Sequence, residues 1–297
     1  MVGKIEIYGL KINGEICRGT DLSKLIVEEA EKQIGGIAEG DIIVVTSKIV
    51  SKAEGRVYNL ADVKPSRKAQ RLSKFYKTPP EVMELYLKAG RIVAIIPVEK
   101  FARKFWVFFA EHAANVEEAL RVIEEHPYLF LIDVNGKLLS WGGIDFSNAP
   151  PGHCTAPPVD PDESAKAIRS GVKRLTGKDV AVVIADTEWK LDKFGSVDIA
   201  IGCCGINPVK RGFGGRDLYG KPKFGGVDNL ADLVSAAANM VLGQTGEATP
   251  VAIIRGLRYE KSEKGIKDIT YSREVFRETL KAAVWEGVKF KLVSKLP

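Results

Sequence analysis

Short apolar segments that alternate with amphipathic segments are the feature that most constrains the fold. The β-branched runs Ile42–Thr46 and Val180–Ala185 predict short buried strands. After these strands, residues 228–242 carry apolar side chains at helical spacing. With 45% apolar and 28% charged residues, the chain of 297 residues has enough apolar material for a sizeable core, which excludes a disordered protein.

Cap and turn residues set the limits of the expected elements. Asp21 and Gly35 are typical of the start and end of a helix, and Asn135–Gly136 is typical of a tight hairpin. We expect strands at residues 4–8, 42–46, 91–98, 128–134, 137–141, 180–185 and 251–254, and helices at residues 21–33, 66–76, 80–88, 115–126, 163–175, 228–242 and 272–285. Because hairpins occur beside alternating strands and helices, the pattern predicts an α+β fold with mixed sheets and packed helices.

The chain shows no clear linker between domains. We place a boundary near residue 140, between an N-terminal α/β part (1–140) and a C-terminal part (141–297), with one joint catalytic unit as the alternative. The aromatic run Phe105–Phe109 lacks interleaved charges, so we expect it in the core rather than on a base-stacking surface.

Charge and composition limit the partners and the compartment. Lys and Arg (44) exceed Asp and Glu (38), which favours anionic partners, although a solvated basic surface is equally consistent. No apolar run approaches the roughly 18 residues of a membrane helix, and the start lacks an export signal, so we expect a cytoplasmic protein. Abundant Lys and Glu with scarce Gln are typical of thermophiles, and the four cysteines, without a C-x-x-C pair, are expected to be reduced thiols.

One stretch imitates a phosphate-binding P-loop. Residues 215–221 match the pattern G-x-x-x-x-G-K, but Pro222 follows where the motif needs a hydroxyl group and a backbone N–H. We therefore expect a turn that carries Arg216 toward an anion. His153–Cys154 is not expected to supply a nucleophile and its base, because neighbours on a strand point in opposite directions.

Oxygen-bearing side chains follow several predicted elements. Asp186–Thr187 come directly after the run 180–185, Asp145 and Asn148 follow the predicted hairpin, and Gln244 follows the long helix. Such ligands suit Mg²⁺ or Mn²⁺ bound together with phosphates, but caps and turns use the same residue types. Ser47, Lys48 and Lys52 follow strand 42–46 and could bind a polyphosphate or form a solvated basic loop.

Together these segments resemble the coenzyme F420-0:γ-glutamyl ligase family. The resemblance runs in order through residues 9–12, 47–56, 143–148, 157–162, 186–187, 215–220, 242–247 and 250–256. It implies a cytoplasmic, dimeric enzyme with an α+β fold of its own, neither a P-loop nor a Rossmann fold. The implied activity is an acid–amino-acid ligase: GTP activates a carboxylate of the phosphorylated deazaflavin precursor as an acyl phosphate, and L-glutamate displaces the phosphate to give a γ-linked amide.

The resemblance also implies the site residues and cofactors. The expected cofactors are Mg²⁺ or Mn²⁺ at two sites, with K⁺ as a further candidate, and no side-chain nucleophile is required. The implied metal ligands are Asp145, Asp186, Thr187 and Gln244. The implied nucleotide site contains Leu10, Lys11, Ile12, Asn13, Ser47, Lys48, Lys52, Asn148, Leu242, Gly243, Gln244, Thr245, Gly246, Glu247, Ala248 and Thr249.

Three segments depart from the family pattern. The Asp–Thr pair usually leads into Gly–Arg, whereas here Glu188 and Trp189 follow, so Lys190 or Lys193, with Arg216, become candidate contacts for an anion or the acceptor. Residues 99–126 look like an insertion, and 203–208 lack the usual small apolar run. The alternatives are a ligase for a different acceptor, a GTP- and metal-binding protein that has lost ligation, and a basic nucleic-acid-binding protein.

Overall fold

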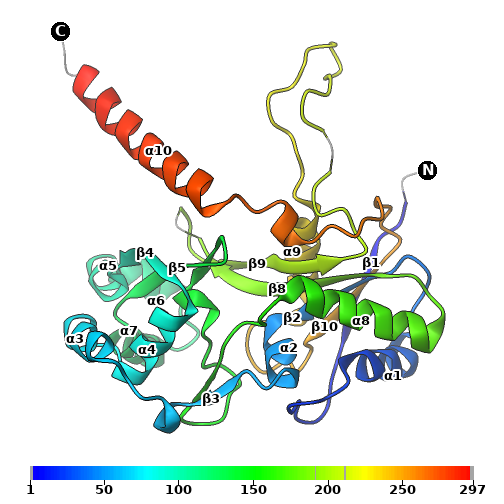
Figure 1. The fold of residues 1–297 in the computed structure, drawn as a ribbon, viewed down its shortest axis with the longest axis horizontal. Helices are drawn as coiled ribbons and strands as arrows, with labels where there is room; N and C mark the ends of the chain where they lie inside the picture. Colours follow the sequence, from blue (N-terminus) through cyan, green and yellow to red (C-terminus); the bar gives the residue numbers. More distant parts are fainter. Residues whose placement is uncertain (1–2, 191, 211, 295–297) are drawn as a thin grey trace.

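A five-stranded mixed sheet lies at the centre of the computed structural model, which describes residues 3–190, 192–210 and 212–294 (Figure 1). The sheet has the order β1-β10-β2-β8-β9, with β2 and β8 parallel and all other neighbours antiparallel. Its strands are β1 (Glu6–Leu10), β2 (Ile42–Thr46), β8 (Ala181–Trp189), β9 (Ser196–Cys204) and β10 (Val251–Arg255). This architecture confirms the predicted α+β fold with mixed sheets, and the sheet combines strands from both sides of residue 140.

Helices cover both faces of the central sheet. Helices α1 (Leu22–Ile34) and α8 (Pro161–Thr176) pack on one face, and α9 (Leu230–Leu242) packs on the other. In β2, Ile43 and Val45 join the first core and Ile42 and Val44 join the second. Because successive side chains of a strand point to opposite faces, β2 is apolar throughout rather than alternating.

A second, three-stranded sheet builds its own core beside the first. It contains β4 (Arg91–Ile96), β5 (Leu129–Val134) and β6 (Lys137–Ser140), and it packs with α3 (Arg67–Tyr76) and α4 (Pro80–Ala89). The hairpin predicted at Asn135–Gly136 joins β5 to β6, with both residues at positive φ. A short two-stranded sheet pairs β3 (Val57–Asn59) with β7 (His153–Thr155). Short 3₁₀ helices cover Leu60–Asp62, Trp141–Gly143 and Ile266–Asp268.

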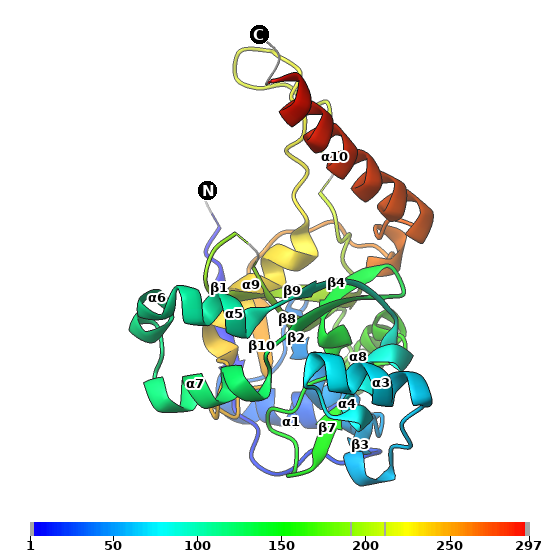
Figure 2. The ribbon, with the colours of Figure 1, turned by 90° about the vertical axis from the view of Figure 1, so that its left-hand side faces the viewer.

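The aromatic run is not in the core, so that prediction was wrong. It falls at the junction of α5 (Val98–Lys104) and α6 (Trp106–Glu111), which with α7 (Val116–Glu125) extend to one side of the body (Figure 2). Phe105 is 46% exposed and Val107 74% exposed. Helix α6 is short and packs chiefly through Phe108 and Phe109 against Phe194, with ring centroids 5.4 Å and 5.3 Å apart, which leaves the rest of the run uncovered.

Two segments extend from the body on the same side. One lies between β9 and α9, around residues 212–226, and the other is α10 (Arg273–Val293), which continues beyond the predicted end at residue 285 (Figure 1). The imitation P-loop lies in the first of these segments and forms a turn, in which the Asp217 amide donates to the Lys221 carbonyl. Within the described residues, no helix is both long and apolar enough to cross a membrane.

Several other elements differ from the prediction. β1 lies two residues later than the expected 4–8, because Leu10 pairs with Val251 of β10. Ser47 and Lys52 lie on helix α2 (Ser47–Ala53) rather than on a loop. β8 continues to Trp189, so Asp186 and Thr187 lie inside a strand rather than after it. The reason is β9, which the sequence pattern missed and which pairs with β8 along its whole length.

Candidate functional site

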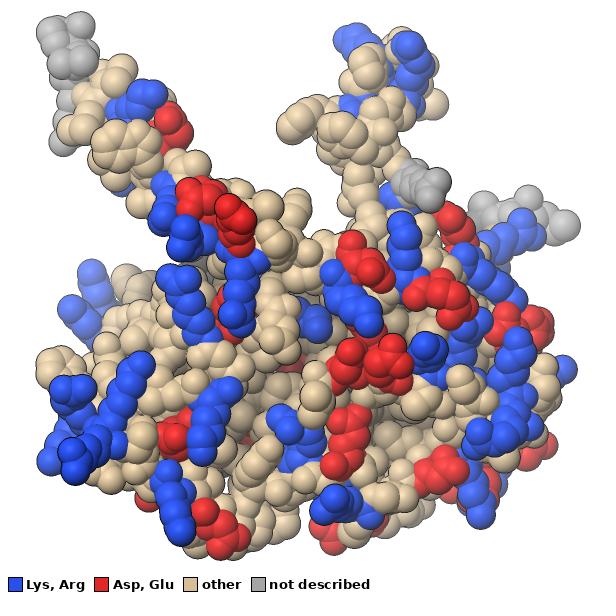
Figure 3. Space-filling model, viewed as in Figure 1, with Lys and Arg blue, Asp and Glu red and all other residues tan. Residues whose placement is uncertain are grey.

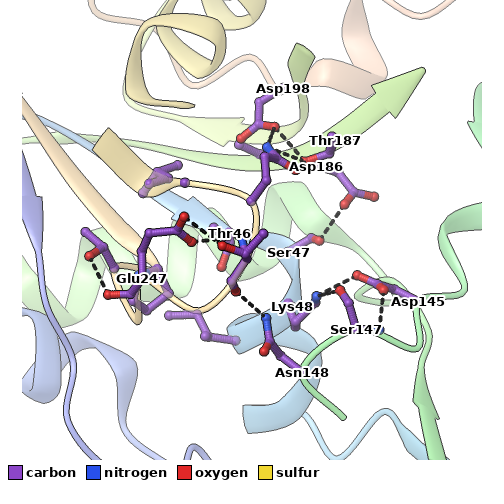
Figure 4. A pocket seen from close by; sticks show the side chains of 18 of the residues that line it. Thr46, Ser47, Lys48, Asp145, Ser147, Asn148, Asp186, Thr187, Asp198 and Glu247 are labelled. Carbon is purple, nitrogen blue, oxygen red and sulfur yellow. Dashed lines mark hydrogen bonds and ion pairs between the residues drawn. The ribbon is translucent and has the colours of Figure 1, made fainter. Parts of the chain in front are cut away.

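A cavity of about 620 Å³ lies where β2 ends and α2 begins (Figure 4). Segments from distant parts of the chain line it. They include most of the site residues expected from the sequence: Ile12, Ser47, Lys48, Lys52, Asp145, Asn148, Asp186, Thr187 and residues 242–249. The structure therefore brings together, in one place, side chains that the sequence distributes over more than two hundred positions.

The parallel pairing of β2 with β8 brings Ser47 next to Asp186. Thr46 pairs with Ala185, so the next residues along the two strands, Ser47 and Asp186, lie side by side. The chain then turns into α2 at Ser47, while β8 continues past the end of β2. The Ser47 hydroxyl donates a hydrogen bond to Asp186 Oδ1 at 2.9 Å. The carboxylate thus lies just beyond the end of β2, inside β8 rather than after it.

The protein environment raises the pKa of Asp186 to about 7. Burial of the carboxylate is the largest cause, and the negative charges of Glu188 and Asp145 add to it, whereas the hydrogen bond from Ser47 acts in the opposite direction. A partly buried carboxylate that accepts a hydrogen bond from Ser47 gains from a cation beside it. Asp186 is therefore suited to bind a metal ion.

Lys48 connects α2 to the loop after the second sheet. Its Nζ lies 2.7 Å from Asp145 Oδ2 and also contacts the Ser147 hydroxyl. The Ser147 amide donates to Asp145 Oδ1 at 2.8 Å, which fixes the carboxylate in the loop. Asp145 is therefore held at the cavity, with its charge balanced by the ammonium group of Lys48, which also lines the cavity.

Asp198 is a site residue that sequence reasoning missed. It pairs with Thr187 across β8 and β9, is 4% exposed, and accepts a hydrogen bond of 2.6 Å from the Thr187 hydroxyl. The side-chain amide of Gln244 lies 3.3 Å from Thr187 Oγ1 and 3.4 Å from Asp198 Oδ1. The alternation of Val197, Ile199 and Ile201 with Asp198 and Ala200 was the available signal for this strand.

Glu188 was also not selected from the sequence. Both the amide and the hydroxyl of Ser140 donate to its carboxylate, at 3.0 Å and 2.6 Å. Burial raises the pKa of Glu188, and these hydrogen bonds oppose the rise. Because Ser140 ends β6, this contact joins the second sheet to β8 of the central sheet and helps to fix the cavity between them.

The loop after α9 closes another side of the cavity. It begins at Gly243, where a Cβ would lie 2.3 Å from the Glu247 carboxyl carbon. Glu247 accepts hydrogen bonds from the amide and hydroxyl of Thr245, at 2.8 Å and 2.9 Å. The Asn148 side chain donates to the Thr245 carbonyl at 3.0 Å, and the Ile12 amide donates to the Ala248 carbonyl at 2.9 Å. The loop is thus braced internally and tied to two other predicted segments.

Six of the expected residues lie outside the lining of this cavity. Leu10 is fully buried in the core, and the Lys11 amide binds the Gln33 side chain. Asn13 is exposed next to the lining residues Ile12 and Gly14. Lys190 and Lys193 lie on the connection from β8 to β9. Arg216 lies on the extended segment 212–226, where its guanidinium donates to the Gly220 carbonyl at 2.6 Å.

The donor atoms and the charge balance of the cavity fit a divalent cation. The described residues contain no cluster of three His, Cys, Asp or Glu side chains close enough to hold a metal by themselves. The expected ligands are two carboxylates with neutral oxygens, a set that suits Mg²⁺ or Mn²⁺ sharing its coordination with substrate phosphates. Six carboxylates line the cavity against two ammonium groups: Glu15, Asp145, Asp186, Glu188, Asp198 and Glu247 against Lys48 and Lys52.

Comparisons with known proteins identify the family of this chain. The sequence model of the family "F420-0:Gamma-glutamyl ligase" matches residues 9–256. The chain is 32% identical over 280 residues to the Coenzyme F420:L-glutamate ligase of Methanopyrus kandleri, covering 92% of this chain and 98% of that protein. It is 31% identical over 280 residues to the protein of the same name from Archaeoglobus fulgidus, covering 94% of this chain and 98% of that protein. The chain belongs to the F420-0:gamma-glutamyl ligase family.

Proposed function

We propose that the protein is a metal- and GTP-dependent ligase that joins L-glutamate to coenzyme F420-0 or a related phosphorylated acceptor. The observation that carries the proposal is the meeting of Asp145, Asp186, Thr187 and Gln244 at one cavity, next to the loop 242–249. The names of the relatives from Methanopyrus kandleri and Archaeoglobus fulgidus support the choice of L-glutamate and an F420 acceptor.

The proposed reaction has two balanced steps. A carboxylate oxygen of the acceptor attacks the γ-phosphorus of GTP, the bond to the bridging oxygen breaks, and GDP leaves. The glutamate amine then attacks the acyl carbon. The C–N bond forms as the C–O bond to phosphate breaks, inorganic phosphate leaves, and the amine proton passes to solvent. Both steps depend mainly on positioning and charge neutralisation, so they need no side-chain nucleophile.

Particular residues have distinct roles in this proposal. Lys48 and Lys52 supply positive charge near the triphosphate, and Asn148 and the loop 242–249 hold the nucleotide. A divalent cation bound by Asp145, Asp186, Thr187 and Gln244 would neutralise phosphate charge. Asp198 and Glu188 keep β8 and its neighbours in place through their hydrogen bonds.

The test is equilibrium binding of GTP in the presence of Mn²⁺, followed by an assay for the amide product. The wild type should bind GTP in preference to ATP and form product from L-glutamate and F420-0. Asp186→Ala should abolish both activities. Asp192→Ala is the matched control, because Asp192 is an exposed aspartate on the turn between β8 and β9. Absence of GTP binding by the wild type would refute the proposal, and binding without product would limit it to the nucleotide site.

The family resemblance also leads us to propose a homodimer. Large apolar side chains on the segment 212–226 support this proposal, since Leu218 is 102% exposed and Phe224 98% exposed. Exposed apolar surface of this kind is typical of protein contacts. A second copy of the chain is the partner that the proposal requires.

A further inference from the structure

A second cavity, of about 610 Å³, lies on the other side of Ile144, which lines both cavities. It lies between β3, α4, the β5–β6 hairpin and residues 156–161. Four basic side chains and one acidic side chain line it: Arg56, Lys64, Lys88 and Lys137, with Asp62. Its charge balance is therefore the reverse of that of the first cavity.

Lys137 is the most informative of these residues. Its side chain is half-buried, and among the described residues it forms no ion pair with a carboxylate. Burial lowers the pKa of Lys137 and the charge of Lys267 adds to this effect, while the charges of Asp162 and Asp160 oppose it. The Asp162 carboxylate already accepts hydrogen bonds from the backbone amides of Cys203, Ile266 and Lys267. A cation that has lost water without gaining a direct partner favours the binding of an anion.

The other cations leave donors available at the same cavity. Arg56 Nε donates to the Pro157 carbonyl at 2.7 Å, and its guanidinium lies 5.8 Å from the centre of the Tyr58 ring. These two contacts fix the guanidinium, and among residues 3–190, 192–210 and 212–294 its terminal amino groups make no hydrogen bond. Within the described ranges Lys64 forms no ion pair, and the exposed Lys88 forms only one, at 3.4 Å from the buried Glu84.

The surface next to the cavity adds positive charge. Helix α3 starts three residues after Lys64 and carries Arg67, Lys68, Arg71 and Lys74, none of which forms an ion pair in the described part of the chain. Figure 3 shows Lys and Arg side chains gathered over α3 on this face. Helix α3 contacts α4, which lines the cavity, and like charges near a cavity raise the local concentration of anions.

The remaining walls of the cavity are largely apolar. Pro157, Pro158 and Val159 form one wall, and Leu85 and Val134 lie among the other lining residues. An inorganic anion would make no apolar contact with these walls. An organic molecule with several anionic groups would contact the apolar walls and also bind the basic side chains.

We propose that this second cavity is a binding site for an organic anion that carries two or more phosphate or carboxylate groups. The ligand is either the acceptor of the ligation or a separate metabolite, since both present this chemistry. Anion binding here requires neither GTP nor ligation, so it can be tested even if the proposed function is wrong.

The test is a calorimetric titration of the wild type with benzenetricarboxylate, compared with inorganic phosphate. We expect saturable binding of benzenetricarboxylate and weaker binding of phosphate. The double variant Lys64→Met/Lys137→Met should reduce the affinity about tenfold or more, because two charge-assisted contacts are lost. Lys100→Met/Lys178→Met is the matched control, since both of these lysines are exposed and lie outside the cavity lining.

The outcomes separate the proposal from its alternatives. Equal affinity in the double variant and the control, or no saturable binding by the wild type, would overturn the proposal. Displacement of the probe by GTP, with no effect of the double variant, would place the anion in the first cavity and also overturn it. Lys64→Met alone provides a second test if the double variant does not fold, because Lys64 is exposed. Displacement of benzenetricarboxylate by F420-0 would show that the cavity binds the acceptor. Binding of benzenetricarboxylate that F420-0 does not displace would assign the cavity to a different anionic metabolite.

Discussion

Asp198 should control the affinity of the first cavity for a divalent cation, although it is not one of the expected ligands. The perturbation is Asp198→Asn, which preserves the shape of the side chain but removes its charge. Asp198 accepts the Thr187 hydroxyl at 2.6 Å and lies 3.4 Å from the Gln244 amide. It thereby fixes how both of these candidate ligands present their oxygens.

The expected magnitude follows from these contacts. A hydrogen bond to a charged group contributes about 1.5–3 kcal/mol, and about 1.4 kcal/mol corresponds to a tenfold change in affinity. Loss of the charge should therefore weaken Mn²⁺ binding by about 10- to 100-fold, which is also the range typical of residues that orient metal ligands. An asparagine can in addition present its NH₂ group to Gln244 and turn the glutamine oxygen away from the cavity.

The assay is a titration with Mn²⁺ in the presence of GTP, in which electron paramagnetic resonance measures the concentration of free Mn²⁺. Asp192→Asn is the matched control, since it makes the same substitution on an exposed turn of the same hairpin. Thermal unfolding of each variant shows whether the fold is intact. Equal Mn²⁺ affinity in Asp198→Asn and the wild type, together with loss of binding in Asp186→Asn, would refute the reasoning that Asp198 orients the ligands.

Two further predictions concern stability and assembly. Burial raises the pKa of Asp232, so the native state binds its proton more tightly than the unfolded chain does, and the free energy of unfolding should fall as pH rises through the native pKa. Urea unfolding over a pH series should show a flatter dependence in Asp232→Asn than in the wild type or in the control Asp228→Asn, and equal slopes would contradict this assignment. In sedimentation equilibrium the wild type should have twice the mass of the 32.5 kDa chain, and Leu218→Ser/Phe224→Ser should shift it toward the monomer. A wild type that is monomeric at all concentrations would contradict the proposed dimer.

The sequence predicted the elements whose own residues determine their structure. β2 is apolar on both faces, so its bounds at Ile42 and Thr46 were predicted correctly. Asp21 and Gly35 flank α1 as expected, because the Asp21 carboxylate accepts the Lys24 amide and Gly35 has φ 72°. These signals are local, so no knowledge of the partner segments was needed.

Other features depend on contacts that a single segment does not encode. The end of β8 is set by its pairing with β9, and Asp198 becomes a site residue only because that pairing puts it opposite Thr187. Helix α2 has seven residues, and four of them are polar or basic: Ser47, Lys48, Ser51 and Lys52. Its local pattern therefore resembled a loop. The candidate site was predictable where expected residues lie side by side through strand pairing, as Ser47, directly after β2, and Asp186, inside β8, do. The second cavity had no signal in the sequence because its cations come from four separate segments.

The charge balance of the two cavities leads to different requirements for binding. The first cavity has an excess of carboxylates, so a triphosphate would be repelled there unless cations enter with it. The second cavity has four basic side chains against Asp62, so an organic anion needs no added metal. A chelator should therefore remove GTP binding and leave the binding of benzenetricarboxylate unchanged. Since Ile144 lines both cavities, an acceptor anchored in the second cavity would lie across this residue from the proposed metal and nucleotide site. In this proposal the basic side chains of the second cavity hold the acceptor, while an exchangeable metal ion in the first cavity holds the nucleotide.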